Sequence, residues 1–451
     1  MSIRGDLLLP APSHATQFPG GATSNARLSV TIGIDWGTSF TKAVVRAEAE
    51  AYAVRFDDAA LGADAYLMPS LLFLDDRGRA FDRRRTGGQR MGGLKMELFR
   101  LAGADEPDAE NSARAVVYLA GVIRRARAWF LYEQAGAYRT RRLRWNLHLG
   151  MPSEGYTNTA LVDALYTVAQ AAWHLSTQPG PLRVETAMYV WRDVVQGRTL
   201  PALDCEQVDV LPEIAAQVVG YAHENRARPG LRILMDIGAM TVDLAGFALF
   251  ERDGANRYAC YGTNVSHAGV QNLHRNRIQF LLSALEGKPL EGETFARLTM
   301  AMRKMEDPAQ PVPRTLRPYL SGQLRTLVTT PEGPDAAMAE RCRQALQAQL
   351  SALWKQKAAH QRSWAEGLPI FMCGGGCTQP VYQQAVREVS ARWQAFAGVG
   401  AFRLFTLAPP ADLVAPRLAP ELYHRLSVAY GLTFPAEEVG ALRIATHPNN
   451  G

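Results

Sequence analysis

The chain has 451 residues and a net charge of +6, with 47% hydrophobic and 20% charged residues. This composition excludes wholesale disorder, and since a single hydrophobic core stops growing at about 250–300 residues, we expect two large lobes. Five cysteines, an odd number in a long chain, argue against a disulfide scaffold. No apolar run approaches the roughly 20 residues that span a bilayer, so we expect a cytoplasmic protein.

Basic residues gather at 83–85, 124–127 and 139–144. We interpret these clusters as solvent-exposed surface. The alternative is that they form a face that binds an acidic partner. No nucleic-acid-binding motif accompanies them, so nucleic acid is not an expected partner. We expect protein partners or self-association, with these arginine clusters, Arg124 and Arg125 among them, and the helical segment at about Asn272–Lys357 as the contact surfaces.

Residues 1–27 are rich in Pro, Gly, Ser and Ala, which predicts a flexible leader. From Leu28 a buried strand pattern runs to Asp35, and after a glycine-containing turn a second strand covers Lys42–Arg46, so the two form a hairpin. The other elements expected in this half are strands at Leu67–Leu74, Leu143–Leu149 and Ala187–Trp191, and helices from Ser112 as N-cap, at Asn158–His174 and at Ile214–Tyr221.

The pattern then restarts with a strand at Leu231–Asp236 and a hairpin partner at Thr241–Phe250. The first aspartates of the two hairpins lie 201 positions apart (236 − 35). This coarse repeat predicts two similar α/β lobes that face each other. The expected boundaries are 28–222 with an insertion at about 62–110, 231–434 with a helical insertion at about 272–357, and a tail at 435–451.

The turn of the first hairpin carries groups that suit a metal-bound phosphate. Gly37 lets the backbone approach a ligand closely, and Thr38 and Ser39 can present N–H and hydroxyl groups to phosphate oxygens. Asp35 would repel phosphate unless a hydrated magnesium ion lay between them. Lys42 offers a positive charge.

The second hairpin repeats the set, with Asp236, Gly238, Thr241 and Asp243. One such turn is a weak signal, because Asp-x-Gly turns are common in hairpins. Two of them at strand ends in opposite halves predict a clamp that holds one triphosphate from both sides.

Two more segments complete the pattern. A predicted strand, Leu368–Met372, leads into Gly374, Gly375 and Gly376, where a flat base or sugar can lie on the backbone. Glu213 opens a short helix, a position that the helix dipole favours for a carboxylate.

Together these segments resemble the phosphate-1, connect-1, phosphate-2 and adenosine motifs of the actin-like ATPase superfamily, which includes actin, sugar kinases and DnaK-type chaperones. The resemblance implies two ribonuclease-H-like lobes, a duplicated fold with subdomain insertions and an interlobe nucleotide cleft. It also implies ATP and Mg²⁺ as cofactors and slow Mg-dependent ATP hydrolysis. The implied roles are the hydrated metal for Asp35 and Asp236, the attacking water for Glu213, phosphate contacts for Gly37, Thr38, Ser39, Lys42, Lys95, Gly238 and Thr241, and the adenosine for Gly374, Gly375 and Gly376.

Several segments look DnaK-like: Met68-Pro69-Ser70, Gly150-Met151-Pro152, and Lys95 near the place of that family's catalytic lysine. Lys42 instead looks actin-like, so either lysine could contact the phosphates. Only 20 residues follow Gly431 (451 − 431), so we expect no peptide-binding domain. The first hypothesis is an ATPase switch that acts through separate partner proteins. The alternatives are a filament-forming bacterial actin homologue, a small-molecule kinase and a non-hydrolysing nucleotide sensor.

Overall fold

The structure is a computed structural model of the whole chain. It describes residues 14–23, 26–81, 88–102, 108–152, 158–198, 204–224, 228–252, 255–306, 310–320, 322–328, 333–356 and 361–440. Most of the expected leader, the arginine cluster at 83–85 and the end of the expected tail lie outside these residues.

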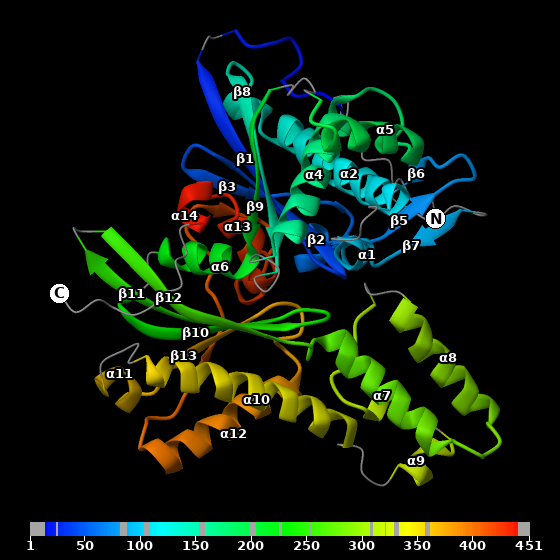
Figure 1. Cartoon of the computed structure of the whole chain (residues 1–451), viewed down its shortest axis with the longest axis vertical. Helices are drawn as coiled ribbons and strands as arrows, with labels where there is room; N and C mark the ends of the chain where they lie inside the picture. The colour runs from blue at the N-terminus through cyan, green and yellow to red at the C-terminus, as the bar shows by residue number, and fades with distance from the viewer. Residues whose placement is uncertain are drawn as a thin grey trace.

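The chain is a mixed α/β protein (Figure 1). Its strands are β1 (Arg27–Trp36), β2 (Phe40–Ala47), β3 (Glu50–Ala53), β4 (Met68–Pro69), β5 (Leu72–Leu74), β6 (Ala80–Phe81), β7 (Gln89–Met91), β8 (Arg142–Met151), β9 (Cys205–Pro212), β10 (Gly230–Ile237), β11 (Val242–Arg252), β12 (Ala255–Ser266), β13 (Pro369–Cys373), β14 (Arg403–Phe405) and β15 (Leu413–Val414).

Its α-helices are α1 (Leu94–Leu101), α2 (Ala109–Glu133), α3 (Ala135–Tyr138), α4 (Thr159–Thr177), α5 (Val184–Val195), α6 (Glu213–Ala222), α7 (Val270–Ala284), α8 (Gly292–Glu306), α9 (Leu324–Leu327), α10 (Gly333–Lys355), α11 (Gln361–Ala365), α12 (Pro380–Ala397), α13 (Ser427–Gly431) and α14 (Ala436–Gly440). Short 3₁₀ helices are η1 (Gly62–Tyr66), η3 (Arg317–Tyr319) and η4 (Pro420–Arg425). No helix in the described ranges is long and apolar enough to cross a membrane.

Two larger sheets share one strand pattern. The first has the order β15-β3-β2-β1-β8-β9, with β4 beside β2, and the second has the order β12-β11-β10-β13-β14. In each, the first three strands of the repeat are antiparallel neighbours. The fourth strand is parallel to the first and pairs with it, and the fifth strand is parallel to the fourth and pairs with it. A small third sheet, β6-β5-β7, lies in the first half of the chain, where the insertion at about 62–110 was expected.

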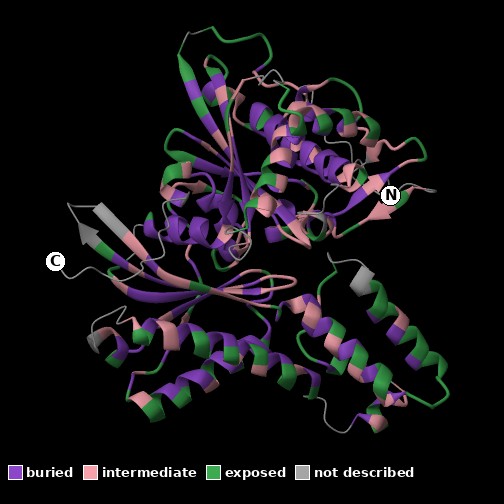
Figure 2. Cartoon of the chain, viewed as in Figure 1, coloured by how far each residue is buried: buried purple, intermediate pink, exposed green. Residues whose placement is uncertain are grey.

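Successive side chains along a strand point to opposite faces of its sheet, so the two faces of each sheet pack into different hydrophobic clusters. In β10, Ile233, Met235 and Ile237 pack with α10 and α12, whereas Leu234 points the other way, into a cluster with α6 and α13. That cluster also takes Val44 from β2, so it joins the two sheets. Figure 1 shows α6 and α13 between the sheets, and in Figure 2 both are almost wholly buried.

The same alternation directs two aspartates into the space between the sheets. Asp236 follows Leu234 by two residues and therefore lies on the α6 side of β10. In β1, Gly33 lies against α13, since a Cβ there would be 2.4 Å from the carbonyl oxygen of Ala429. Asp35, two residues later, shares that face.

Three local predictions are wrong. The segment Ala187–Trp191, predicted as a strand, lies within α5, because Ala187, Val190 and Trp191 are buried at helical spacing. The N-cap of α2 is Asp108 rather than Ser112, with its carboxylate accepting from the N–H groups of Glu110 and Asn111 at 3.0 and 3.1 Å.

The third correction concerns the arginines on α2, part of the expected contact surface. Arg124 is only 8% exposed and donates to carbonyls at the carboxyl end of α4, among them Ser176 at 3.0 Å. Arg127 is fully buried. These guanidinium groups satisfy the last carbonyls of a helix, so they belong to the core rather than to a docking face.

Arg127 also ties down residues that precede β1. Its Nε donates to the carbonyl of Ala15 at 3.0 Å, and Phe18 is 4% exposed in the first core. The Trp145 indole donates to the carbonyl of Thr16 at 2.8 Å. Within the segment expected as a leader, residues around 15–18 therefore pack against the first lobe.

Replacing Arg127 by methionine is expected to lower the free energy of unfolding by about 2–4 kcal/mol, because buried carbonyl oxygens lose their donors. The loss is measured as a fall in the midpoint of thermal or urea unfolding. Arg139→Met, at an exposed position after α3, is the matched control. Equal stability of the two variants would contradict this role of Arg127.

Candidate functional site

The first hairpin brings a carboxylate and an ammonium group together. Asp35 is the penultimate residue of β1 and stands directly opposite Lys42 on β2. The Lys42 Nζ donates to Asp35 Oδ2 at 2.8 Å, and Asp35 is 6% exposed. Gly37, Thr38 and Ser39 form the turn between the strands.

The turn is supported from behind by Ser70, which follows β4. Its hydroxyl donates to the carbonyl of Gly37 at 2.6 Å, and its N–H donates to the carbonyl of Ser39 at 2.9 Å. The hydroxyls of Thr38 and Ser39 make no hydrogen bond to any of the described residues, and both residues are half-buried. These two hydroxyls are therefore available to a ligand.

The second hairpin has the same layout with a second acid in place of the lysine. Asp236 is the penultimate residue of β10 and lies opposite Asp243 on β11. Thr241 donates to Asp243 Oδ2 at 2.8 Å, and the N–H of Gly238 donates to the carbonyl of Thr241 at 2.9 Å. The Oδ1 atom of Asp243 is buried and has no hydrogen-bond partner among the described residues.

The glycine-rich turn after β13 packs directly on the second hairpin. Gly374 has φ +76°, and a Cβ there would lie 2.1 Å from Asp236 Oδ1, so no other residue fits. The N–H of Gly376 donates to the carbonyl of Ile237 at 2.9 Å. Contact with the hairpin thus accounts for these two glycines, whatever the turn binds.

Glu213 and Lys95 form an ion pair between α6 and α1. Lys95 Nζ lies 2.7 Å from Glu213 Oε1, and their side chains are 5% and 23% exposed. One turn further along α6, Gln217 donates to Asp236 Oδ2 at 2.6 Å. A single short helix therefore presents Glu213 to one lysine and Gln217 to the aspartate of the second hairpin.

The carboxylates form one electrostatic cluster. Burial, and next the negative charge of Asp35, raise the pKa of Asp236 to about 7, while Lys42 and the Gln217 hydrogen bond oppose the rise. Burial and the charge of Asp236 raise the pKa of Asp243 to about 7 as well, and Glu213 adds to both. Asp35, Glu213 and the neighbouring pair Asp236 and Asp243 come from three separate segments of the chain and concentrate negative charge in one place.

The structure brings together most of the residues singled out from the sequence. Asp35, Lys42, Glu213, Lys95 and Asp236 are linked by contact or by charge. Gln217 was not foreseen, although its position four residues after Glu213 on a helix was a usable signal. In the described part of the chain, no three His, Cys, Asp or Glu side chains are arranged to hold a metal ion directly.

The raised pKa values predict that the protein without metal or nucleotide loses stability as pH rises from about 4 to about 7. The unfolded chain ionises Asp236 and Asp243 near pH 4, whereas the folded chain binds their protons up to about pH 7. Asp243→Asn should therefore flatten the fall of Tm between pH 5 and pH 8. The exposed Asp163→Asn should leave that fall unchanged, and an equally steep fall in Asp243→Asn would contradict the assignment.

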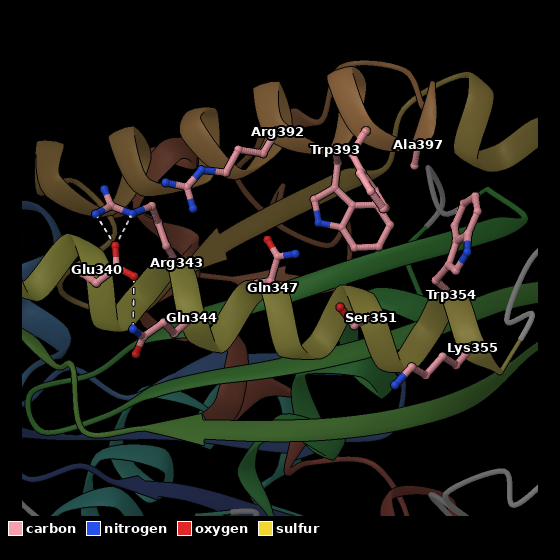
Figure 3. A pocket seen from close by; sticks show the side chains of 11 residues that line it. Glu340, Arg343, Gln344, Gln347, Ser351, Trp354, Lys355, Arg392, Trp393 and Ala397 are labelled. Atoms are coloured by element: carbon pink, nitrogen blue, oxygen red, sulfur yellow. Dashed lines mark hydrogen bonds and ion pairs between the residues drawn. The ribbon is translucent and has the colours of Figure 1, made fainter.

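A groove of about 620 Å³ lies elsewhere, between α10 and α12 (Figure 3). Its apolar end is formed by Trp354, Trp393 and Phe396, and Phe396 is 94% exposed. The opposite end holds Arg343, which is paired with Glu340 and Glu388. The groove shares no residue with the carboxylate cluster, so it is a separate surface feature.

A scan of the chain against protein-family models found no match, and a search of curated proteins found no significant one.

Proposed function

We propose that the chain binds ATP with Mg²⁺ between its two hairpins and hydrolyses it, as a slow ATPase of the actin-like type. The observation that carries the proposal is the convergence of two equivalent hairpins. Their aspartates lie 201 positions apart, yet the charge of Asp35 raises the pKa of Asp236. A buried carboxylate cluster of this kind is stabilised by a divalent cation.

The strand pattern supports a duplicated ribonuclease-H-like fold. Both sheets place the third, second, first, fourth and fifth strands of the repeat side by side in that order, with the same parallel and antiparallel pairs. Each hairpin aspartate is the penultimate residue of the first strand of its repeat and lies on the inter-sheet face. Equivalent positions in two facing lobes suit a ligand held from both sides.

The residues fit a hydrated magnesium ion better than a directly bound one. Asp236 accepts from Gln217 and Asp35 from Lys42, so each aspartate keeps a second oxygen for a water ligand. Magnesium usually retains several waters and takes few carboxylates. The ion would neutralise the phosphate charge.

The residues of the chain would promote hydrolysis by positioning the reacting groups and by electrostatic stabilisation. Thr38 and Ser39 would donate to phosphate oxygens on one side, and the Gly238–Thr241 turn would face them on the other. Glu213 would accept a proton from the attacking water, or orient that water. Lys95, held 2.7 Å from Glu213, would fix the orientation of this carboxylate toward the phosphate.

Among the alternatives, the Lys95–Glu213 pair favours the switch, because Lys95 lies near the place of the catalytic lysine of DnaK-type chaperones. The joint core of α6 and α13 supports coupling of the site to lobe movement, since α6 carries both Glu213 and Gln217. We therefore propose that ATP-dependent lobe closure acts on separate partner proteins. The filament-forming homologue remains the second candidate, favoured by Lys42 in the first hairpin.

Sedimentation of the full chain with ATP and Mg²⁺, with phosphate release read from the same samples, separates the two. Phosphate release without pelleting supports the switch. Nucleotide-dependent pelleting supports the filament. Absence of both phosphate release and pelleting, at concentrations where ATP binding is saturated, would rule out an ATPase.

A further inference from the structure

A guanidinium group that hydrogen-bonds to none of the described residues lies beside the carboxylate cluster. Arg425, the last residue of η4, is half-buried. Its Cζ is 5.7 Å from the centroid of the Phe40 ring, at the start of β2. A Cβ on Gly375 would be 3.7–3.8 Å from three guanidinium atoms, which is ordinary van der Waals contact. Arg425 therefore touches the first hairpin and the glycine-rich turn at once.

The charged neighbours of Arg425 do not pair with it. Among the described residues it forms no ion pair and no hydrogen bond, whereas Lys42 and Lys95 are each paired with a carboxylate. Burial lowers the pKa of Arg425, and the charges of Asp64, Asp35 and Asp236 act in the opposite direction. The guanidinium group therefore lies within electrostatic range of both hairpin aspartates, and its N–H groups donate to none of the described residues.

The guanidinium group of Arg425 carries five N–H donors. In the described residues none of its nitrogens is both fully buried and unpartnered, so these donors face solvent, where an anion can reach them. Phosphate is the natural match, because a guanidinium fork donates two parallel hydrogen bonds to its oxygens.

We propose that Arg425 binds a phosphate oxygen of the nucleotide and so joins the first hairpin, the glycine-rich turn and α13 through the ligand. The inference rests on the proposed nucleotide site. It adds a residue that no motif of the sequence singled out. Stacking on the base is the less suitable role, because Phe40 and Gly375 already pack against the guanidinium.

The test compares the affinities of the full chain for Mg-ATP, Mg-ADP and adenosine by calorimetry or by competition with a fluorescent nucleotide. Arg425→Ala should weaken ATP and ADP binding roughly 10- to 100-fold, the range of a charge-assisted hydrogen bond. Adenosine binding should change less than about twofold. Arg425→Met, which keeps the apolar contact with Phe40, should behave as Arg425→Ala, and Arg425→Lys should recover part of the affinity.

Arg387→Ala, at an exposed position on α12, removes the same charge far from the hairpins and should bind as the unaltered chain does. Unchanged ATP affinity in both Arg425→Ala and Arg425→Met would overturn the inference and leave the nucleotide site standing. An equal loss for adenosine and ATP would also overturn it, because the contact would then be to the nucleoside. If the unaltered chain bound no nucleotide, the proposed function itself would fail.

Discussion

Replacing Asp236 by asparagine is expected to weaken Mg-ATP binding by roughly 10- to 100-fold and, without ligand, to stabilise the protein at pH 8. Both effects have one cause. The carboxylate is half-buried, and burial and the charge of Asp35 raise its pKa to about 7. At pH 8 the folded chain therefore carries an unfavourable charge, which Lys42 and Gln217 offset in part and which a bound cation would offset further. Asparagine keeps the shape and an acceptor for Gln217 but removes the charge.

Calorimetric binding and thermal unfolding of the same samples check this pair of effects, with Asp163→Asn as the control for a lost surface charge. A destabilised Asp236→Asn would mean that the aspartate is structural. Unchanged Mg-ATP affinity would remove Asp236 from the site.

Replacing Glu213 by glutamine is expected to reduce the rate of phosphate release by roughly 10²- to 10⁴-fold while changing the Kd for ATP little. Glutamine cannot accept the proton of the attacking water, and it leaves the buried Lys95 without its counter-charge. Single-turnover phosphate release and equilibrium binding, measured separately, report the two quantities.

Lys95→Met is the companion variant, because it leaves the Glu213 carboxylate in place but unpaired. Its rate should fall by a smaller factor. If Glu213→Gln released phosphate at the original rate, Glu213 would serve only as the ion-pairing partner of Lys95 in the first turn of α6.

The two hairpins could be predicted from the sequence, because each joins buried strands through a short turn that contains glycine. Because side chains alternate along a strand, Asp236 takes the same face as Leu234, and Asp35 the same face as Gly33. Which face that is depends on where Leu234 and Gly33 pack in the core. The prediction of a strand at Ala187–Trp191 was wrong for a related reason. A short apolar run fits a strand and a helix equally well, and only its packing in α5 decides.

The contacts between distant segments could not be predicted from the sequence. Nothing local links Lys95 to Glu213, or Arg425 to Phe40, because these pairs meet only through tertiary packing. The same applies to Arg124. The sequence predicts a basic surface at its cluster, whereas in the structure Arg124 packs against the end of α4. Burial of long polar side chains depends on partners that sequence periodicity does not reveal.

The central claim, that one nucleotide is held by both hairpins, is tested most directly by hydrogen–deuterium exchange of the full chain with and without Mg-ATP. The account predicts slower exchange in two separate segments, 36–42 and 237–243, and in the turn at 374–377. Protection of only one hairpin, or of neither under saturating ATP, would contradict it.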